Sequence, residues 1–261
     1  MSTSDILLRE QRGAAAILTL NRVEKHNSLS GELLIAIAQA VRALDEDPSV
    51  RGIVIAGQDD FFSTGADLNE ALAATELPKI ISFLDNFRNA NSVIESSRKP
   101  VIAAICGYCL TGGLELALAC DLRFAGDNAQ FGITSAKIGS VAGAGGTQRL
   151  ARLIGSDHTK DLLFSARFID AQRAYDIGLV TTVLPRNEVL DAAIERIEEY
   201  AKQAPLSVWL SKIAINIGQQ LDLESSLVFE QLLTAAAFGT QDRKEGMSAF
   251  LEKRKAKFTG A

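Results

Sequence analysis

Short apolar runs of strand length alternate with longer segments that carry an apolar stripe at helical spacing. Three strand–helix pairs are expected, at residues 14–20 with 30–44, 52–56 with 80–94, and 101–105 with 113–120. A further strand is expected at 121–125. Alternating strands and helices predict an α/β fold, and the recurrence after about 45 to 50 residues indicates stacked copies of one unit.

The strand pattern ends near residue 186, and only helical patterns follow it. The expected C-terminal helices are at 187–203, 205–217, 223–238 and 242–257. We therefore expect a core domain over residues 1–200 and a helical oligomerisation segment over 201–261. That segment would pack on the α/β body or on a neighbouring subunit.

The charge balance argues against a broad anionic partner. The chain of 261 residues carries 32 acidic and 27 basic side chains, for a net charge of -5. This balance predicts no binding to nucleic acid and none to an anionic membrane. The N-terminus lacks a basic region followed by an apolar run, and no apolar stretch reaches the roughly 18 residues of a spanning helix. We expect a soluble, cytoplasmic protein.

The three cysteines are too few for a disulfide framework. Cys106 and Cys109 have C-x-x-C spacing, which could serve redox chemistry or provide half of a metal site. The chain has only two histidines, and the strand at 101–105 leads directly into this motif. These facts favour buried core cysteines, Cys120 included, and no metal is expected.

Two glycine-containing segments, at 61–70 and 107–115, each place backbone N–H groups at a turn that leads toward a helix. Together they predict an oxyanion hole. In a reaction of an acyl thioester the carbonyl oxygen gains negative charge as an enolate forms. Two fixed N–H donors in a dry site stabilise that charge by several kcal/mol.

Glu115 follows Gly112 by three residues and falls in the first turn of an expected helix. The helix N-terminus favours the carboxylate, whereas the leucines around it disfavour the charge. A pKa between these limits suits a general acid/base. The spacing alone is more typical of a glutamate that only satisfies N–H donors at the start of a helix.

An ordered series of motifs resembles the crotonase superfamily, the enoyl-CoA hydratases and isomerases, over nearly all of the chain. The matching segments are Asn21-Arg22 through Asn27-Ser28-Leu29, Phe62 through Leu68, Pro100 through Asp121, Gly143 through Leu150, and Asp242 through Met247. The resemblance implies a spiral of ββα repeats with a helical trimerisation segment, assembled as a homotrimer or hexamer. It also implies an acyl-CoA substrate and no separate cofactor, because coenzyme A is part of the substrate.

The resemblance also assigns roles to residues of both glycine segments. The backbone N–H groups of Ala66 and Gly112 would form the oxyanion hole. Ala66, Asp67, Leu68 and Asn69 would line the path of the pantetheine and adenine. Glu115 falls on a catalytic position of the family.

Further coenzyme A contacts are implied at the two ends of the chain. Lys25 and His26 align with the loop against the nucleotide end. Phe250 and Lys253 lie on a C-terminal helix that approaches the coenzyme A of a neighbouring subunit. From charge alone, the basic run around Lys253 is more typical of a solvated helix end that favours the helix dipole.

One position departs from the family pattern. Alignment of Phe131-Gly132 and Gly139 places Ser135 where the family's hydratases have a second glutamate. A serine hydroxyl can hold a water by hydrogen bonding but is no equivalent proton acceptor. Lys137 is expected at the surface, and Asp67 is expected to hydrogen-bond its own loop, so neither replaces the missing carboxylate.

These features predict an acyl-CoA thioester enzyme of the enoyl-CoA hydratase/isomerase family, with Glu115 as the single proton-transfer acid/base. Because Ser135 replaces the second glutamate, enoyl-CoA isomerisation and acyl-CoA decarboxylation are the alternatives. A non-catalytic acyl-CoA-binding subunit is the alternative from another class. Residues 70–87 are expected to shape the acyl pocket.

Overall fold

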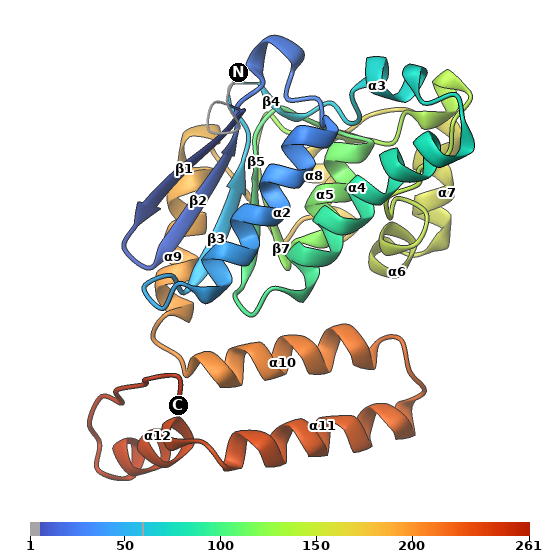
Figure 1. Cartoon of the computed structure of the whole chain (residues 1–261). Helices are drawn as coiled ribbons and strands as arrows, with labels where there is room; N and C mark the ends of the chain where they lie inside the picture. The colour runs from blue at the N-terminus through green and yellow to red at the C-terminus, as the bar shows by residue number, and fades with distance from the viewer. Residues whose placement is uncertain (1–5, 59) are drawn as a thin grey trace.

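The computed structural model describes residues 6–58 and 60–261, and its centre is a mostly parallel sheet of six strands (Figure 1). In sheet order the strands are β1 (Leu7–Arg12), β2 (Ala15–Leu20), β3 (Gly52–Ala56), β5 (Val101–Ile105), β7 (Leu122–Gly126) and β10 (Thr182–Leu184). Only β1 pairs antiparallel with its neighbour. Strands β3 and β5 are buried at every position, as their continuous apolar sequences predict for parallel strands covered on both faces.

A second, smaller sheet stands beside the first. Its strands, in order, are β4 (Phe61–Ser63), β6 (Tyr108–Leu110), β8 (Gln130–Gly132) and β9 (Ile169–Asp170). Each of β4, β6 and β8 follows a strand of the large sheet, so a unit is a long strand, a short strand and then helix. The α/β architecture of stacked units is therefore confirmed. The short strands showed no hydrophobic period in the sequence because three residues are too few to display one.

Helices cover both faces of the large sheet. On one face α2 (Gly31–Glu46), α4 (Leu77–Ser96) and α5 (Gly112–Ala119) share the main core with side chains of β3 and β5. On the other face α9 (Val189–Tyr200) closes a second core over β2, β3, β5 and β7. All eight residues of α5 are buried. Each fully buried leucine or isoleucine contributes about 1.5–3 kcal/mol, which fixes α5 and thereby the site that it carries.

The C-terminal helices lie apart from the sheets, below the α/β body in Figure 1. They are α10 (Pro205–Gly218), α11 (Leu223–Phe238) and α12 (Gln241–Leu251). Neither α10 nor α11 has a buried residue, and Leu223 is 72% exposed. The helix α10 is joined to the body by an ion pair of 2.8 Å between Lys212 Nζ and Asp121 Oδ2.

The last helix is shorter than the predicted segment at 242–257, which was wrong beyond residue 251. The tail folds back on α12 instead. Arg254 Nη1 and Nη2 contact the two oxygens of Glu245 at 2.6 and 2.9 Å, and the Lys257 N–H donates to Glu245 at 2.8 Å. Lys253 has φ +54°, which ends the helical path.

Several short helices were not predicted. They are α3 (Leu68–Ala73), α6 (Arg149–Ile154), α7 (Ser156–Ser165) and α8 (Ala171–Asp176), with 3-10 turns at Val23–Lys25, Ser135–Ile138 and Arg186–Glu188. Among residues 6–58 and 60–261, no helix is both long enough and apolar enough to cross a membrane.

The three thiols lie in or near the core. Cys109 and Cys120 are buried and Cys106 is half-buried. Burial raises the pKa of Cys120 to about 12 and that of Cys109 well above its ordinary value. The interpretation of Cys109 and Cys120 as core residues is confirmed, and both stay protonated at neutral pH.

Candidate active site

A cavity of about 380 Å³ lies where the loop before α3, the start of α5 and the turn after β8 meet. Most of the predicted site residues line it: Lys25, Ala66, Asp67, Leu68, Asn69, Gly112, Glu115 and Ser135. His26 does not line it, and its ring stacks on Phe61 with centroids 4.3 Å apart. Phe250 lies on α12 and is 83% exposed. The structure does not bring Phe250 or Lys253 to the cavity of the same chain.

The Ala66 N–H is directed away from Leu29, with which Ala66 forms a parallel backbone pair. Leu29 N–H donates to the Gly65 carbonyl at 2.7 Å, and Asp67 N–H donates to the Leu29 carbonyl at 3.0 Å. In such a parallel pairing the residue between the two bonded groups turns its own N–H to the opposite side. For Ala66 that side is the cavity, which this residue lines.

The Gly112 N–H is a second donor at the same place, and the described part of the chain offers it no acceptor. It opens α5, where the first N–H groups have no acceptor within the helix. A Cβ on Gly112 would lie 3.2 Å from Ala66 N and 3.0 Å from a ring carbon of Phe87. Standard bond lengths therefore place the two amide nitrogens within about 6 Å of each other. Two donors this close can reach one oxygen.

The turn before Gly112 is held in an unusual conformation. Thr111 has φ +45° and ψ −111°, which costs a β-branched residue about 1–3 kcal/mol. Its Oγ1 accepts from Thr134 N–H at 3.0 Å and lies 2.9 Å from Thr134 Oγ1. The Thr111 N–H donates to the Gly132 carbonyl at 2.8 Å. These hydrogen bonds stabilise the strained backbone conformation of Thr111. No feature of the sequence predicted this conformation.

Glu115 is 3% exposed, and the 143–146 loop holds its carboxylate. Its Oε1 accepts from Ala144 N–H and Gly146 N–H, both at 2.8 Å. The other oxygen, Oε2, has no partner among the residues that the structure describes and remains for the cavity. Glu115 therefore does not cap its own helix, which excludes the purely local alternative.

Two opposing effects act on the proton affinity of Glu115. Burial raises the pKa of its carboxyl group, while the N–H groups of Gly146 and Ala144 and the charge of Arg149 lower it. Burial is the larger effect, so the pKa is raised. The predicted competition is present, but the N–H donors come from a distant loop and not from the start of α5.

The 143–146 loop is itself fixed from behind. The Ala144 carbonyl accepts from Asn91 Nδ2 at 2.9 Å and from Arg149 Nη1 at 3.2 Å. Arg149 Nη2 pairs with Glu95 Oε2 at 2.7 Å. The roles of these three side chains were missed, although the glycine-rich run before Arg149 marked a loop.

Ser135 lines the same cavity and is buried. Within the described residues its hydroxyl has no hydrogen-bond partner, so it is free to bind a ligand or a water. Lys137 is exposed, does not line the cavity, and lies over the Phe168 ring at 5.4 Å. The prediction that Lys137 is a surface residue is confirmed.

Asp67 is the other carboxylate beside the cavity, and it is already paired. Its Oδ2 lies 3.0 Å from Arg22 Nη2, and its Oδ1 accepts from Asn69 N–H at 3.1 Å. Burial raises the pKa of Asp67, but the bonds from Arg22 and Asn69 outweigh that effect and lower it. The two carboxyl groups therefore have pKa shifts in opposite directions, and only that of Glu115 moves toward neutral pH.

The remaining walls of the cavity are mainly apolar. They include Ala71, Phe83, Leu84 and Phe87 from the segment expected to shape an acyl pocket. Ile138, Val141 and Ala142, from a later segment of the chain, line the same cavity. In residues 6–58 and 60–261, no three histidine, cysteine or acidic side chains are grouped to hold a metal.

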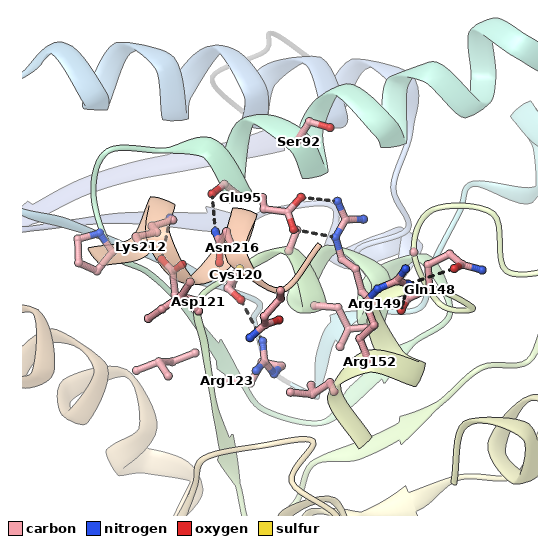
Figure 2. A pocket seen from close by; sticks show the side chains of 18 of the residues that line it. Ser92, Glu95, Cys120, Asp121, Arg123, Gln148, Arg149, Arg152, Lys212 and Asn216 are labelled. Atoms are coloured by element: carbon pink, nitrogen blue, oxygen red, sulfur yellow. Dashed lines mark hydrogen bonds and ion pairs between the residues drawn. The ribbon is translucent and has the colours of Figure 1, made fainter. Parts of the chain in front are cut away.

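A larger cavity of about 1460 Å³ lies between α10 and the body (Figure 2). Its wall includes the Glu95–Arg149 and Asp121–Lys212 pairs. Leu84, Gly143 and Ala144 line both cavities. The smaller one is the candidate active site, because it alone joins the two N–H donors to Glu115 and an apolar wall.

Comparison with known proteins gives concordant matches. The model of the family described as Enoyl-CoA hydratase/isomerase matches residues 10–261. A mitochondrial methylglutaconyl-CoA hydratase of Mus musculus is 40% identical over 258 residues, covering 97% of this chain and 82% of that protein. A crotonyl-CoA hydratase of Syntrophomonas wolfei is 40% identical over 262 residues, covering 99% of each. The crystal structure of an enoyl-CoA hydratase from Bacillus anthracis has a TM-score of 0.93 and 36% identity, over 98% of this chain and 100% of that one.

Proposed function

The chain belongs to the enoyl-CoA hydratase/isomerase family, and we propose that it hydrates an enoyl-CoA thioester in the smaller cavity with Glu115 as its single proton-transfer group. Its likeness to solved enoyl-CoA hydratases confirms the predicted crotonase-type fold. One observation carries the proposal: among the described residues, a buried carboxylate with one oxygen anchored and the other without a partner lies beside two N–H donors that have no acceptor.

The donors account for activation of the thioester. With its carbonyl oxygen between Ala66 N–H and Gly112 N–H, the substrate places its developing enolate charge on two preorganised dipoles. Loss of one such donor costs other enzymes about 2.7–4 kcal/mol of transition-state stabilisation. The apolar wall formed by Phe83, Leu84 and Phe87 excludes water from this charge.

Proton transfer then follows from the free oxygen of Glu115. The carboxylate takes a proton from a water as the water oxygen bonds to the β-carbon, and the double-bond electrons move onto the thioester oxygen. The resulting carboxylic acid returns that proton to the α-carbon, so one water is added and Glu115 is regenerated. The raised pKa of Glu115 suits a group that must both accept and release a proton near neutral pH. The Ser135 hydroxyl would hold the water.

Ser135 also supports a second candidate reaction. Among the described residues that line the cavity, Asp67 is paired with Arg22 and Glu115 is the carboxylate left to react. One carboxylate can still remove a proton at one carbon and return it at another. Enoyl-CoA isomerisation needs no more than this. Decarboxylation needs less, since loss of carbon dioxide forms the enolate directly and the two N–H donors stabilise it.

The family supports the substrate class, and the lining of the smaller cavity supports the choice of acyl group. Members of the family act on coenzyme A thioesters. Relatives named for crotonyl-CoA, methylglutaconyl-CoA and 2,3-dehydroadipyl-CoA span apolar and acidic acyl groups. Lys25 is the only cationic side chain in the described wall of the smaller cavity, and the acyl end is apolar. We therefore favour a short apolar acyl chain.

The contacts assigned to Phe250 and Lys253 require a second copy of the chain. Both are exposed on or beside α12, far along the chain from the cavity. The exposed apolar residues of α11, such as Leu223 and Leu232, support a homotrimer or hexamer in which these helices meet a neighbour. Light scattering coupled to size-exclusion chromatography measures this mass directly.

Turnover of crotonyl-CoA tests the reaction. Loss of the absorbance of the conjugated thioester is followed for the wild-type chain and for Ser135→Glu. Wild-type turnover supports hydration by Glu115 with a serine-held water. No wild-type turnover, with activity gained in Ser135→Glu, would reject hydration and favour isomerisation or decarboxylation. Binding of coenzyme A without turnover of any of these substrates would favour a non-catalytic subunit.

A further inference from the structure

We infer that Arg149 is a positioning residue for Glu115, acting with Glu95 and Asn91 through the 143–146 loop. The inference rests on the proposed role of Glu115. Arg149 does not line the smaller cavity; it lines the larger one, where its guanidinium faces Glu95 (Figure 2). It therefore acts on the reaction through Glu115 and not by touching the substrate.

The contacts form a continuous path. Arg149 Nη1 donates to the Ala144 carbonyl, and the Arg149 backbone N–H donates to the Gly145 carbonyl at 2.7 Å. On the other side of the loop, the N–H groups of Ala144 and Gly146 hold Glu115 Oε1. One side chain and its own backbone thus fix two successive carbonyls between the two N–H groups that orient the carboxylate.

The guanidinium is held in turn by an acid. Nε and Nη2 of Arg149 contact Oε1 and Oε2 of Glu95 at 3.4 and 2.7 Å, the two-point geometry that only arginine offers. The Glu95 carbonyl accepts from Asn216 Nδ2 of α10 at 3.3 Å (Figure 2). The orientation of the Arg149 guanidinium is therefore set by Glu95 of α4, and α10 contacts the backbone of Glu95.

The loop conformation leaves little freedom around this contact. Gly145 has φ +126°, and a Cβ there would lie 2.7 Å from Arg149 Nη1. The guanidinium therefore packs directly against the loop backbone. The Asn91 side chain also donates to the Ala144 carbonyl, from inside the core. Its own Oδ1 is buried without a partner among the described residues, so the side chain serves as a donor only.

The electrostatic effect of Arg149 has the same target. Its charge lowers the pKa of Glu115 and partly offsets the effect of burial. Removal of the guanidinium should therefore loosen the carboxylate and also make it harder to ionise. A role in fold stability alone would produce neither change in the kinetics.

The test compares Arg149→Met with Arg152→Met on crotonyl-CoA, or on the substrate that the wild-type chain turns over. Arg152 lies one turn along α6 and lines the same larger cavity, and among the described residues its guanidinium hydrogen-bonds only to Gln148. Arg149→Met should lower kcat about 10- to 100-fold, as expected for a displaced catalytic group, with little change in KM. Its pH profile should move to higher pH. Arg152→Met should match the wild type in all three.

Two further variants separate positioning from folding. Arg149→Lys retains the charge but not the two-point contact, so its pH profile should stay near that of the wild type while kcat is intermediate. In a Glu115→Gln background, Arg149→Met should cause no further loss, because residues that act through one another are not additive. Thermal unfolding is measured for every variant.

The inference is overturned if Arg149→Met matches Arg152→Met, or if it lowers the unfolding temperature without moving the pH profile. An additive loss in the Glu115→Gln background would overturn it as well. These outcomes leave the proposed function intact as long as Glu115→Gln alone lowers turnover at least about 100-fold. Full activity of Glu115→Gln would instead reject the proposed function itself.

Discussion

Gly112→Ala perturbs the two N–H donors with a single methyl group. The new Cβ would lie 3.0 Å from a ring carbon of Phe87, 3.2 Å from Ala66 N and 3.4 Å from Gly65 Cα. Gly112 has no positive φ, so the substitution introduces no backbone strain. The crowding against Phe87 is mild overpacking and should cost about 1–3 kcal/mol of folding free energy.

The effect on catalysis should be larger than the effect on stability. A carbonyl oxygen must approach within about 3 Å of each nitrogen to accept both bonds. A methyl carbon 3.2 Å from Ala66 N occupies part of that space. Loss of one donor of this kind lowers turnover about 100- to 1,000-fold. The same loss is expected in kcat/KM for Gly112→Ala.

The assay is turnover of the conjugated thioester, measured alongside thermal unfolding. Gly239→Ala is the matched control, since Gly239 ends α11, has ordinary dihedral angles, and its added Cβ would meet nothing closer than 3.4 Å. Gly239→Ala should retain wild-type kinetics. Wild-type kcat/KM in folded Gly112→Ala would show that the two amides do not bind one oxygen, and the oxyanion hole would be refuted.

Three further predictions concern carboxylates. Glu115→Gln should lower turnover at least about 100-fold. Because the folded-state pKa of Glu115 is raised, its contribution to the free energy of unfolding is present below the ordinary pKa of about 4.3 and is lost as pH rises through the folded-state pKa. Denaturant titrations should therefore show the wild type losing stability relative to Glu115→Gln over that pH window. A constant difference in stability would contradict the argument that burial raises this pKa. Ser135→Glu should raise hydration of crotonyl-CoA at least about tenfold if the missing second carboxylate limits the rate, and an unchanged rate would mean that another step does. Glu245→Gln should free the 252–257 tail for trypsin cleavage after Arg254, monitored by mass spectrometry. The reason is that Arg254 and Lys257 bond to the Glu245 carboxylate and lower its pKa to about 2. Equal cleavage of the two proteins would contradict the packing of the tail on α12.

The sequence predicted those elements that repeat a pattern over many residues. The strands at 52–56 and 101–105 and the helix at 223–238 agree with the structure residue for residue. The three-residue strands and short helices carry no period to detect. The segment at 252–257 has helical composition, but ion pairs and backbone bonds to Glu245 turn it away, and such long-range contacts leave no local signal.

The sequence predicted those residues of the candidate site that lie within or next to a recognisable motif. The spacing from Gly112 left the role of Glu115 open, and the resemblance to the crotonase superfamily assigned it a catalytic position. The same resemblance, aligned on Phe131-Gly132 and Gly139, placed Ser135 where the family's hydratases have a second glutamate. The loop that anchors Glu115 lies about 30 residues further along the chain and acts through main-chain N–H groups, which any residue except proline provides. Such a role has no side-chain signature. The left-handed strain at Thr111 is likewise a property of the packed fold.

Turnover of crotonyl-CoA by the wild-type chain and by Glu115→Gln tests the central claim most directly. Glutamine keeps the Oε1 acceptor for Ala144 and Gly146 N–H, so the cavity should stay intact while the proton acceptor is lost. We predict measurable turnover by the wild type and a loss of at least about 100-fold in the variant. Equal turnover by the two proteins would contradict the assignment of Glu115 as the proton-transfer group.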